Sequence, residues 1–216
     1  MSVSTDNGKL TAIAKNKNWD MNWKKSLSIS FKIYVAKDVS TDLKTSGGSI
    51  NLANLRGNQK FATSGGSLTI DGLSGNIDGN TSGGSIKVYN SSDNIDLSTS
   101  GGSIEAKNCK GEMKLSTSGG SLKLLDLDGK ISANTSGGSI NGSNIHGELN
   151  TGTSGGSVRL EGIYGSVDAS TSGGSVSVSV VELGSYVRVS NSGGNITLDL
   201  PQGKGISLDV RGNRVS

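Results

Sequence analysis

Hydrophobic and polar residues follow a repeat of 18 residues through most of the chain. With the threonine of each Thr-Ser-Gly-Gly-Ser stretch as position 1, apolar residues recur at positions 6, 8, 11, 15 and 17, and polar residues lie between them. Alternation with a period of two predicts strands with one buried face. A strict period indicates units that stack on one another. The opening threonines are Thr45, Thr63, Thr81, Thr99, Thr117, Thr135, Thr153 and Thr171.

The Thr-Ser-Gly-Gly-Ser stretch lies between predicted strands. A phosphate-binding loop is needed once, in front of a helix, and no helical pattern follows any copy. A flexible linker has no reason to keep a constant spacing. We therefore predict a structural corner that stacks on the next one. Its two glycines, and the glycine common at position 13, are expected to adopt positive φ.

The predicted fold is all-β: a single-stranded parallel β-helix, or solenoid, with 18 residues per coil, about nine coils and right-handed winding. Equal positions then become neighbours about 4.8 Å apart. Opposite charges alternate in one such column, at Lys87, Glu105 and Lys123. Asparagines line up in others, such as the column that begins at Asn58 and Asn76. Both patterns favour this register over a shifted one.

We predict one structural domain in three segments. Residues 1–44 form an N-terminal β cap and a leading strand, and include Trp19, Trp23 and the alternating run 27–35. Residues 45–190 form the solenoid, and residues 191–216 form the last coil and a C-terminal cap. Caps are expected because open strand edges recruit other chains.

Composition narrows the functional classes. The 34 glycines come with a single proline, which excludes collagen, and a net charge of +3 gives no sign of a nucleic-acid partner. The lone cysteine, Cys109, allows neither an internal disulfide nor a cysteine metal cluster, and its apolar position predicts burial. No apolar run predicts a transmembrane segment. The turns hold no carboxylate for repeat-borne calcium, so we predict no metal site and no cofactor.

One pair of carboxylates could carry chemistry. Asp78 and Asp96 share position 16, so stacking places them about 5 Å apart, a separation similar to that of retaining glycosidases. Lys60 and Lys114 flank them in the same column, and a neutralised surface ladder explains all four residues. We therefore assign no catalytic residue and predict that the chain is not an enzyme.

The only histidine is interpreted as a surface residue. His146 shares a column with Lys110, Asp128 and Tyr164, and no nucleophile with an orienting carboxylate repeats around it. The threonine and serine columns of the corners raise a different possibility, because some ice-binding solenoids display ranks of hydroxyl groups.

The repeated corner motif followed by an apolar residue, the stretch 31–48 and the closing stretch 192–201 resemble the bacterial adhesin-like β-strand-repeat family. The likeness covers roughly residues 27–210. It implies a β-helical domain of a bacterial envelope or surface protein, and it transfers no catalytic residues. We therefore predict a scaffold, extracellular or in the cell envelope or periplasm. Its partners would be surface glycans, envelope polymers or proteins, bound through weak multivalent contacts.

The main alternative is a cytoplasmic scaffold, similar to the bactofilins, that associates end to end instead of remaining a monomer. The polar N-terminus, which is no signal peptide, favours this alternative. A polysaccharide-acting enzyme and an ice-binding solenoid are further alternatives.

Overall fold

In the computed structural model, the described residues are 2–6, 9–13 and 30–202. The chain divides into two units, residues 1–35 and 36–216, each of which is described by itself. All regular secondary structure in the described residues is β-strand, which confirms the all-β prediction. Within these residues, no helix has the length and apolarity that crossing a membrane requires.

The N-terminal unit contains an antiparallel hairpin of β1 (Ser2–Asp6) and β2 (Lys9–Ile13). Residues 30–35, the described part of the alternating run, form no strand. Alternation favours a strand, but a strand also needs a paired edge. The two tryptophans and residues 203–216 lie outside the described residues, so the caps at both ends stay predictions.

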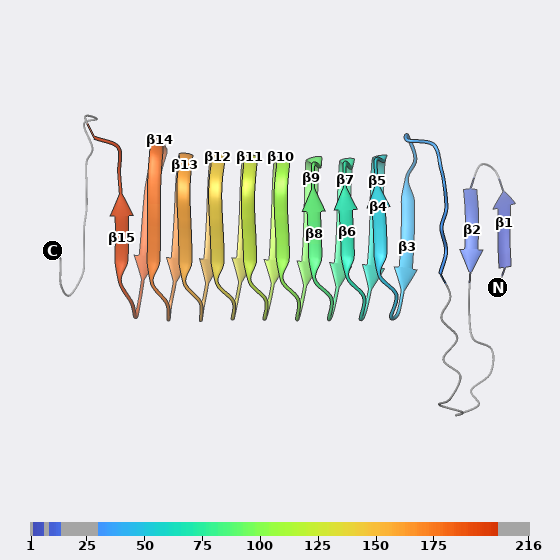
Figure 1. The fold of residues 1–216 in the computed structure, drawn as a ribbon, viewed down its shortest axis with the longest axis horizontal. Helices are drawn as coiled ribbons and strands as arrows, with labels where there is room; N and C mark the ends of the chain where they lie inside the picture. The colour runs from blue at the N-terminus through green and yellow to red at the C-terminus, as the bar shows by residue number, and fades with distance from the viewer. Residues whose placement is uncertain (1, 7–8, 14–29, 203–216) are drawn as a thin grey trace, which may run out of the picture. The chain divides into compact units, whose positions relative to one another are not determined.

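The second unit is a parallel β-solenoid, in which β3 to β15 follow one another along the molecule (Figure 1). Early coils consist of two strands each, whereas in β10 to β14 one strand runs from corner to corner. The strands are β3 (Thr41–Thr45), β4 (Ile50–Ala53), β5 (Arg56–Thr63), β6 (Leu68–Asp71), β7 (Ser74–Thr81), β8 (Ile86–Tyr89), β9 (Ser92–Thr99), β10 (Ile104–Thr117), β11 (Leu122–Thr135), β12 (Ile140–Thr153), β13 (Val158–Thr171), β14 (Val176–Asn191) and β15 (Ile196–Asp199).

Equal repeat positions lie directly above one another, as predicted. Ile104 pairs in register with Ile86 on one side and with Leu122 on the other, and all three side chains are fully buried. The solenoid of about nine coils with 18 residues each is thereby confirmed. Cys109 is buried in the same interior, and this burial raises the pKa of its thiol. The handedness of the coil stays a prediction.

The corner glycines serve close stacking and not positive φ, so half of the glycine prediction was wrong. Neither corner glycine has a positive φ, whereas Gly111 at position 13 has φ +107°. A Cβ on Gly120, at position 4, would lie 1.9 Å from the carbonyl oxygen of Gly102 in the preceding coil. A Cβ on Gly119, at position 3, would meet its nearest atom at an ordinary 3.5 Å. In this corner, therefore, only the second glycine is required by contact.

A second bend lies at position 10, where the sequence predicted only a ladder of amides. Asn90 has φ +50° and Asn108 has φ +53°, and Gly72 occupies the same position with φ +66°. Asparagine, aspartate and glycine tolerate this left-handed conformation better than other residues. The predicted ladder is also present, since Asn108 Nδ2 donates to Asn90 Oδ1 at 3.2 Å.

The corner threonines are buried and fasten consecutive coils. Thr117 Oγ1 donates to the carbonyl oxygen of Gly102 at 2.7 Å and accepts the N–H of Gly120 at 3.2 Å. The same pair of bonds recurs in every coil from Thr63 to Thr171. Each hydroxyl therefore holds its own corner and joins it to the previous one.

Replacing Thr117 with valine should lower the free energy of unfolding by about 1–3 kcal/mol, because valine has nearly the same shape but leaves two backbone groups without partners. Urea denaturation followed by circular dichroism measures the change. Ser118→Ala is the matched control, since this adjacent side chain is exposed and its removal should cost less than about 0.5 kcal/mol. Equal midpoints for the two variants would argue against the role of the threonine hydroxyl.

Candidate functional site

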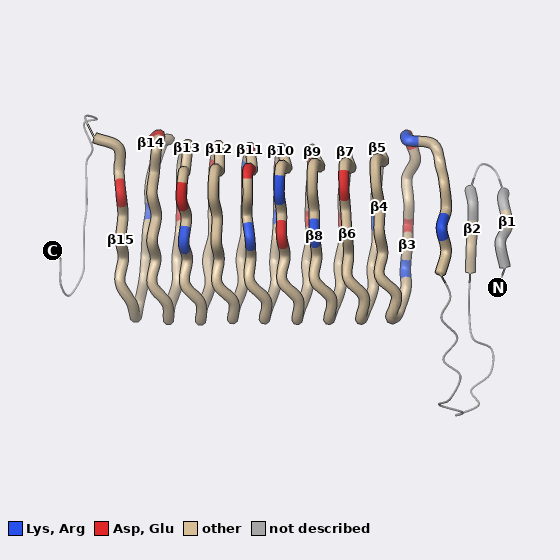
Figure 2. Tube along the Cα trace, in the orientation of Figure 1, with Lys and Arg blue, Asp and Glu red and all other residues tan. Residues whose placement is uncertain are grey.

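The exposed charges of the solenoid are spread along its length and do not gather in one place (Figure 2). Acidic and basic side chains form ion pairs between neighbouring coils, as in Lys123–Glu105 at 3.1 Å and Lys110–Asp128 at 3.6 Å. Most partners remain more than half exposed. Such pairs contribute little stability, about 0–1 kcal/mol each. Their main effect is to place positive and negative charges at regular positions on the surface.

One face of the solenoid carries the strands β4, β6 and β8 and the first halves of the longer strands. Its outward residues occupy positions 5, 7 and 9. Position 5 is a column of serines, in which the Ser103 hydroxyl accepts the N–H of Ser121 at 3.1 Å and the bond repeats in other coils. Position 7 contains the predicted column Lys87, Glu105 and Lys123. This face is therefore flat, polar and regular over several coils.

Glu105 is the most strongly held group of this face. Lys123 Nζ donates to its carboxylate, and Tyr89 Oη donates to the other oxygen at 3.1 Å. The hydrogen bond from Lys123 lowers the pKa of Glu105, and the bond from Tyr89 acts in the same direction. Partial burial, together with Glu105, raises the pKa of Tyr89. The carboxylate therefore stays ionised at neutral pH and serves as an acceptor.

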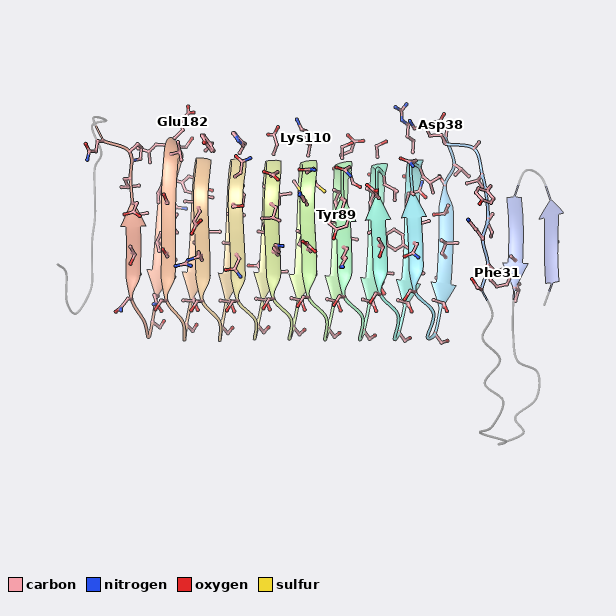
Figure 3. The ribbon with its side chains drawn as sticks, viewed as in Figure 1. Phe31, Asp38, Tyr89, Lys110 and Glu182 are labelled. Atoms are coloured by element: carbon pink, nitrogen blue, oxygen red, sulfur yellow. The ribbon has the colours of Figure 1, made fainter. Side chains whose placement is uncertain are left out.

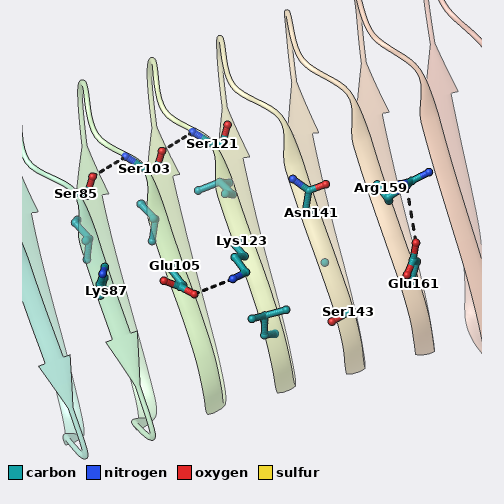
Figure 4. A pocket seen from close by; sticks show the side chains of 15 residues that line it. Ser85, Lys87, Ser103, Glu105, Ser121, Lys123, Asn141, Ser143, Arg159 and Glu161 are labelled. Atoms are coloured by element: carbon teal, nitrogen blue, oxygen red, sulfur yellow. Dashed lines mark hydrogen bonds and ion pairs between the residues drawn. The ribbon is translucent and has the colours of Figure 1, made fainter.

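A hollow lies on this face and is lined by residues from β8 to β13, including those of β12 (Figure 4). Small residues form its floor, since the chain here reads Asn141, Gly142 and Ser143. Lys123 stands on one side and Arg159 on the other, two coils or about 10 Å apart. The hollow has a volume of about 540 Å³. It is a shallow, open trough across neighbouring coils, lined by residues from β8 to β13, and not an enclosed pocket.

The trough offers hydrogen bonds, positive charge and a small apolar wall. Asn141 and Arg159 are exposed, and Leu125 is half-buried beside them. Arg159 Nε lies 3.8 Å from Glu161 Oε1, a loose pair with both side chains about two-thirds exposed. A guanidinium in this state can still bind a carboxylate or a sugar hydroxyl. These groups suit the binding of an extended polar chain, and none of them forms a proton-transfer pair.

The carboxylates of Asp78 and Asp96, whose spacing is similar to that of a glycosidase pair, belong to a ladder in which lysines neutralise their charge. Asp78 and Asp96 are neighbours in register, as predicted. Lys60 Nζ lies 3.5 Å from Asp78, and Lys114 Nζ lies 3.7 Å from Asp96. All four side chains are more than half exposed. They lie on the face of the solenoid that contains β5, β7 and β9 and the second half of β10. The arrangement gives each carboxylate a neighbouring cation.

The histidine column runs along an edge of the solenoid. Figure 3 places Asp38, Lys110 and Glu182 along this edge. The His146 ring stacks on Tyr164 with centroids 4.3 Å apart and an angle of 4°, and His146 Nε2 lies 3.2 Å from Asn144 Oδ1. The column is thus filled by stacking and ion pairs, in agreement with a surface ladder.

The hydroxyl ranks that suggested ice binding are only partly available to solvent. The threonines are buried, and their hydroxyls are already bonded to the corner backbone. The serines at position 5 are exposed but accept a backbone N–H from the next coil. This arrangement gives the ice-binding alternative no additional support.

A side-chain cluster at β14 was not predicted from the sequence. This strand is two residues longer than β13, 16 against 14, and its pairing shifts register between Leu160 and Val167. A bulge of this kind redirects side chains. Tyr186 Oη consequently reaches Glu148 Oε1, two coils away, at 2.8 Å, and Arg188 lies over the Tyr186 ring at 4.9 Å. The signal was present in the sequence: a ninth, variant corner, Asn-Ser-Gly-Gly-Asn, begins at Asn191, 20 residues after Thr171 instead of 18.

Within residues 2–6, 9–13 and 30–202, no group of three or more His, Cys, Asp or Glu side chains could hold a metal ion. Fold and surface together define the chain as a parallel β-solenoid with regular polar faces. Comparison with protein-family models, with characterised proteins and with solved structures found no match. Membership of the adhesin-like family therefore stays a prediction.

Proposed function

We propose that the chain is a non-enzymatic, adhesin-like scaffold of a bacterial envelope or surface protein, which binds extended polymers through weak, repeated contacts. The observation that carries this proposal is the regular face at positions 5, 7 and 9, where polar side chains recur from coil to coil and surround the trough at β12. A rigid parallel ladder fixes the spacing of these groups. Their mutual ion pairs are weak enough to be exchanged for a ligand.

Repetition suits a ligand that is itself repetitive. A polymer held by one weak contact meets the next contact at high effective concentration, so several weak contacts give useful avidity without a deep pocket. Three cations, Lys87, Lys123 and Arg159, line the trough against two carboxylates, and this excess of positive charge favours polymers with carboxylate groups. The ligand class best supported is therefore an acidic polysaccharide that lies along the solenoid face.

Immobilised full-length protein should bind polygalacturonate and release it as salt increases, and it should bind neutral dextran less tightly. The double variant Lys123→Ala/Arg159→Ala should weaken polygalacturonate binding about five- to thirty-fold, because each exposed charged contact contributes about 0.5–1 kcal/mol. Biolayer interferometry at two salt concentrations measures both effects.

A matched control removes the same charge from another face. Lys60→Ala/Lys114→Ala also deletes two exposed cations, but these side chains belong to the ladder with Asp78 and Asp96. It should leave polygalacturonate binding nearly unchanged. Equal losses for the two double variants would show attraction by net charge alone, and absence of binding by the unmodified protein would overturn the proposal.

A further inference from the structure

Within the described residues, which end at 202, the last coil of the solenoid is incomplete. Among the described strands, β15 and the part of β14 beyond Ser179 each pair along one edge only. Core positions are open here, since Ile196 is 46% exposed whereas Val176, its partner in the preceding coil, is 1% exposed. Val187 and Val189 are half-buried, in contrast to their fully buried counterparts in β13. An open edge with apolar side chains is a template for another strand.

Among the described strands of the solenoid unit, the N-terminal end has the complementary unpaired edge. Among the described strands, β3 pairs only with β5, and β4 pairs only with β6. Leu43 and Leu52 are half-buried at this end. Both ends stop at the same point of the coil: β3 and residues 187–191 occupy positions 15 to 1, and β4 and β15 occupy positions 6 to 9. A second copy can therefore continue the ladder without a change of register.

We infer that two copies of this chain associate head to tail, with β3 and β4 of one copy on β14 and β15 of the other. This interface extends the parallel ladder and covers the apolar residues of both ends. The facing pairs are Thr41 with Val187, Asp42 with Arg188, Leu43 with Val189, Lys44 with Ser190, Thr45 with Asn191, Ile50 with Ile196 and Leu52 with Leu198.

Charge and apolar character both match in this register. Asp42 faces Arg188, and both are exposed. Leu43 faces Val189 in the column that Phe61 and Leu97 continue inside the solenoid. Lys44, the remaining charge of β3, faces the neutral Ser190, so no like charges meet.

In the first corner, Thr45 and Gly48 are of the residue types that contact a preceding coil in the later corners, but here the single chain provides no such coil among its described residues. Thr45 accepts the N–H of Gly48, but it lacks the bond to a preceding glycine carbonyl that Thr63 makes to Gly48. A docked copy supplies that acceptor at Gly194, which holds the same corner position. Gly48 is also unlike the later glycines at position 4, because a Cβ there would meet only the Thr45 side chain, at 3.2 Å. A docked copy restores the close backbone approach that the other coils show.

Sedimentation equilibrium of the full chain over a range of concentrations tests the inference. The weight-average mass should rise above the 21.9 kDa of one chain as concentration increases, and negative-stain microscopy should show rods of more than one solenoid length. Asp42→Arg and Arg188→Asp should each weaken association roughly ten-fold or more, and the double variant should restore it. A mass of one chain at all concentrations would overturn the inference and would indicate that each end is covered within one copy.

Gly48→Ala separates assembly from folding. It should abolish association while the melting temperature of the single chain stays within a few degrees of the wild type. In one copy the added methyl group meets only the Thr45 side chain, at 3.2 Å, which can shift slightly, whereas in two copies it also meets backbone atoms. Association that survives Gly48→Ala would contradict the stacking geometry. Lys123→Ala/Arg159→Ala should not change association, so failure of this inference and failure of the polymer-binding proposal are distinguishable.

Discussion

Gly120→Ala should destabilise the solenoid by about 2–4 kcal/mol, whereas Gly119→Ala should cost less than about 1 kcal/mol. The two residues are adjacent in one corner and neither has a positive φ, so the cost of a left-handed conformation does not separate them. Stacking does, because the Cβ of the first variant would lie 1.9 Å from a backbone oxygen and that of the second 3.5 Å from one. Backbone atoms in the middle of a ladder cannot move away without breaking several hydrogen bonds.

Guanidinium denaturation of the two variants, with the wild type as reference, measures this difference. Because repeat arrays can unfold in parts, hydrogen exchange at the corners should accompany the denaturation curves and locate the loss at the coils around Gly120. Similar losses for Gly119→Ala and Gly120→Ala would mean that conformational freedom, and not close approach, explains the paired glycines.

Phe61→Ala should cost about 3–5 kcal/mol, the usual range for a fully buried aromatic side chain. Phe61 is 1% exposed, and its ring fills the space above Gly79, where a Cβ would lie 2.2 Å from Phe61 Cε2. One large residue thus occupies the space of two positions in the column. The loss should be visible as a lower midpoint in urea and as weaker exchange protection in the first coils.

A substitution of Gly79, which neighbours Phe61 in the column, should change stability in opposite directions with and without the Phe61 ring. Gly79→Leu should destabilise the wild type by overpacking, yet it should stabilise the Phe61→Ala variant, in which the space is empty. Leu97 holds the same position in the next coil, so leucine suits the column. If Gly79→Leu is destabilising in both backgrounds by the same amount, the two side chains do not share this space.

Periodicity was sufficient to predict the fold because each coil repeats the same physical demands. The apolar residues at position 6, such as Ile86 and Leu122, alternate with polar ones and are buried in register. The bend at position 10 could have been predicted as well, since asparagine, aspartate and glycine alternate there. The role of Gly120 could not be predicted from the sequence. A positive φ and a close backbone contact both require glycine, so the residue type alone does not distinguish them.

The candidate site was predictable only in part. The charge column of Lys87, Glu105 and Lys123 followed from the register. The trough did not, because it depends on the relative height of neighbouring side chains, which is low at Asn141 and Ser143 and high on both sides. The displacement of Tyr186 toward Glu148 also depended on where two inserted residues are accommodated, and several places within β14 would satisfy the same sequence.

The central claim is that each 18 residues add one layer along a common axis, and distances between spin labels test it most directly. One label replaces the exposed Ser82, and the second replaces Ser136, Ser154 or Ser172, in a background with Cys109 replaced by alanine. Pulsed electron paramagnetic resonance should give mean distances from position 82 of about 14, 19 and 24 Å for labels at 136, 154 and 172, an increase of about 4.8 Å for each added coil. Distances that do not increase by one layer spacing from pair to pair would contradict the account.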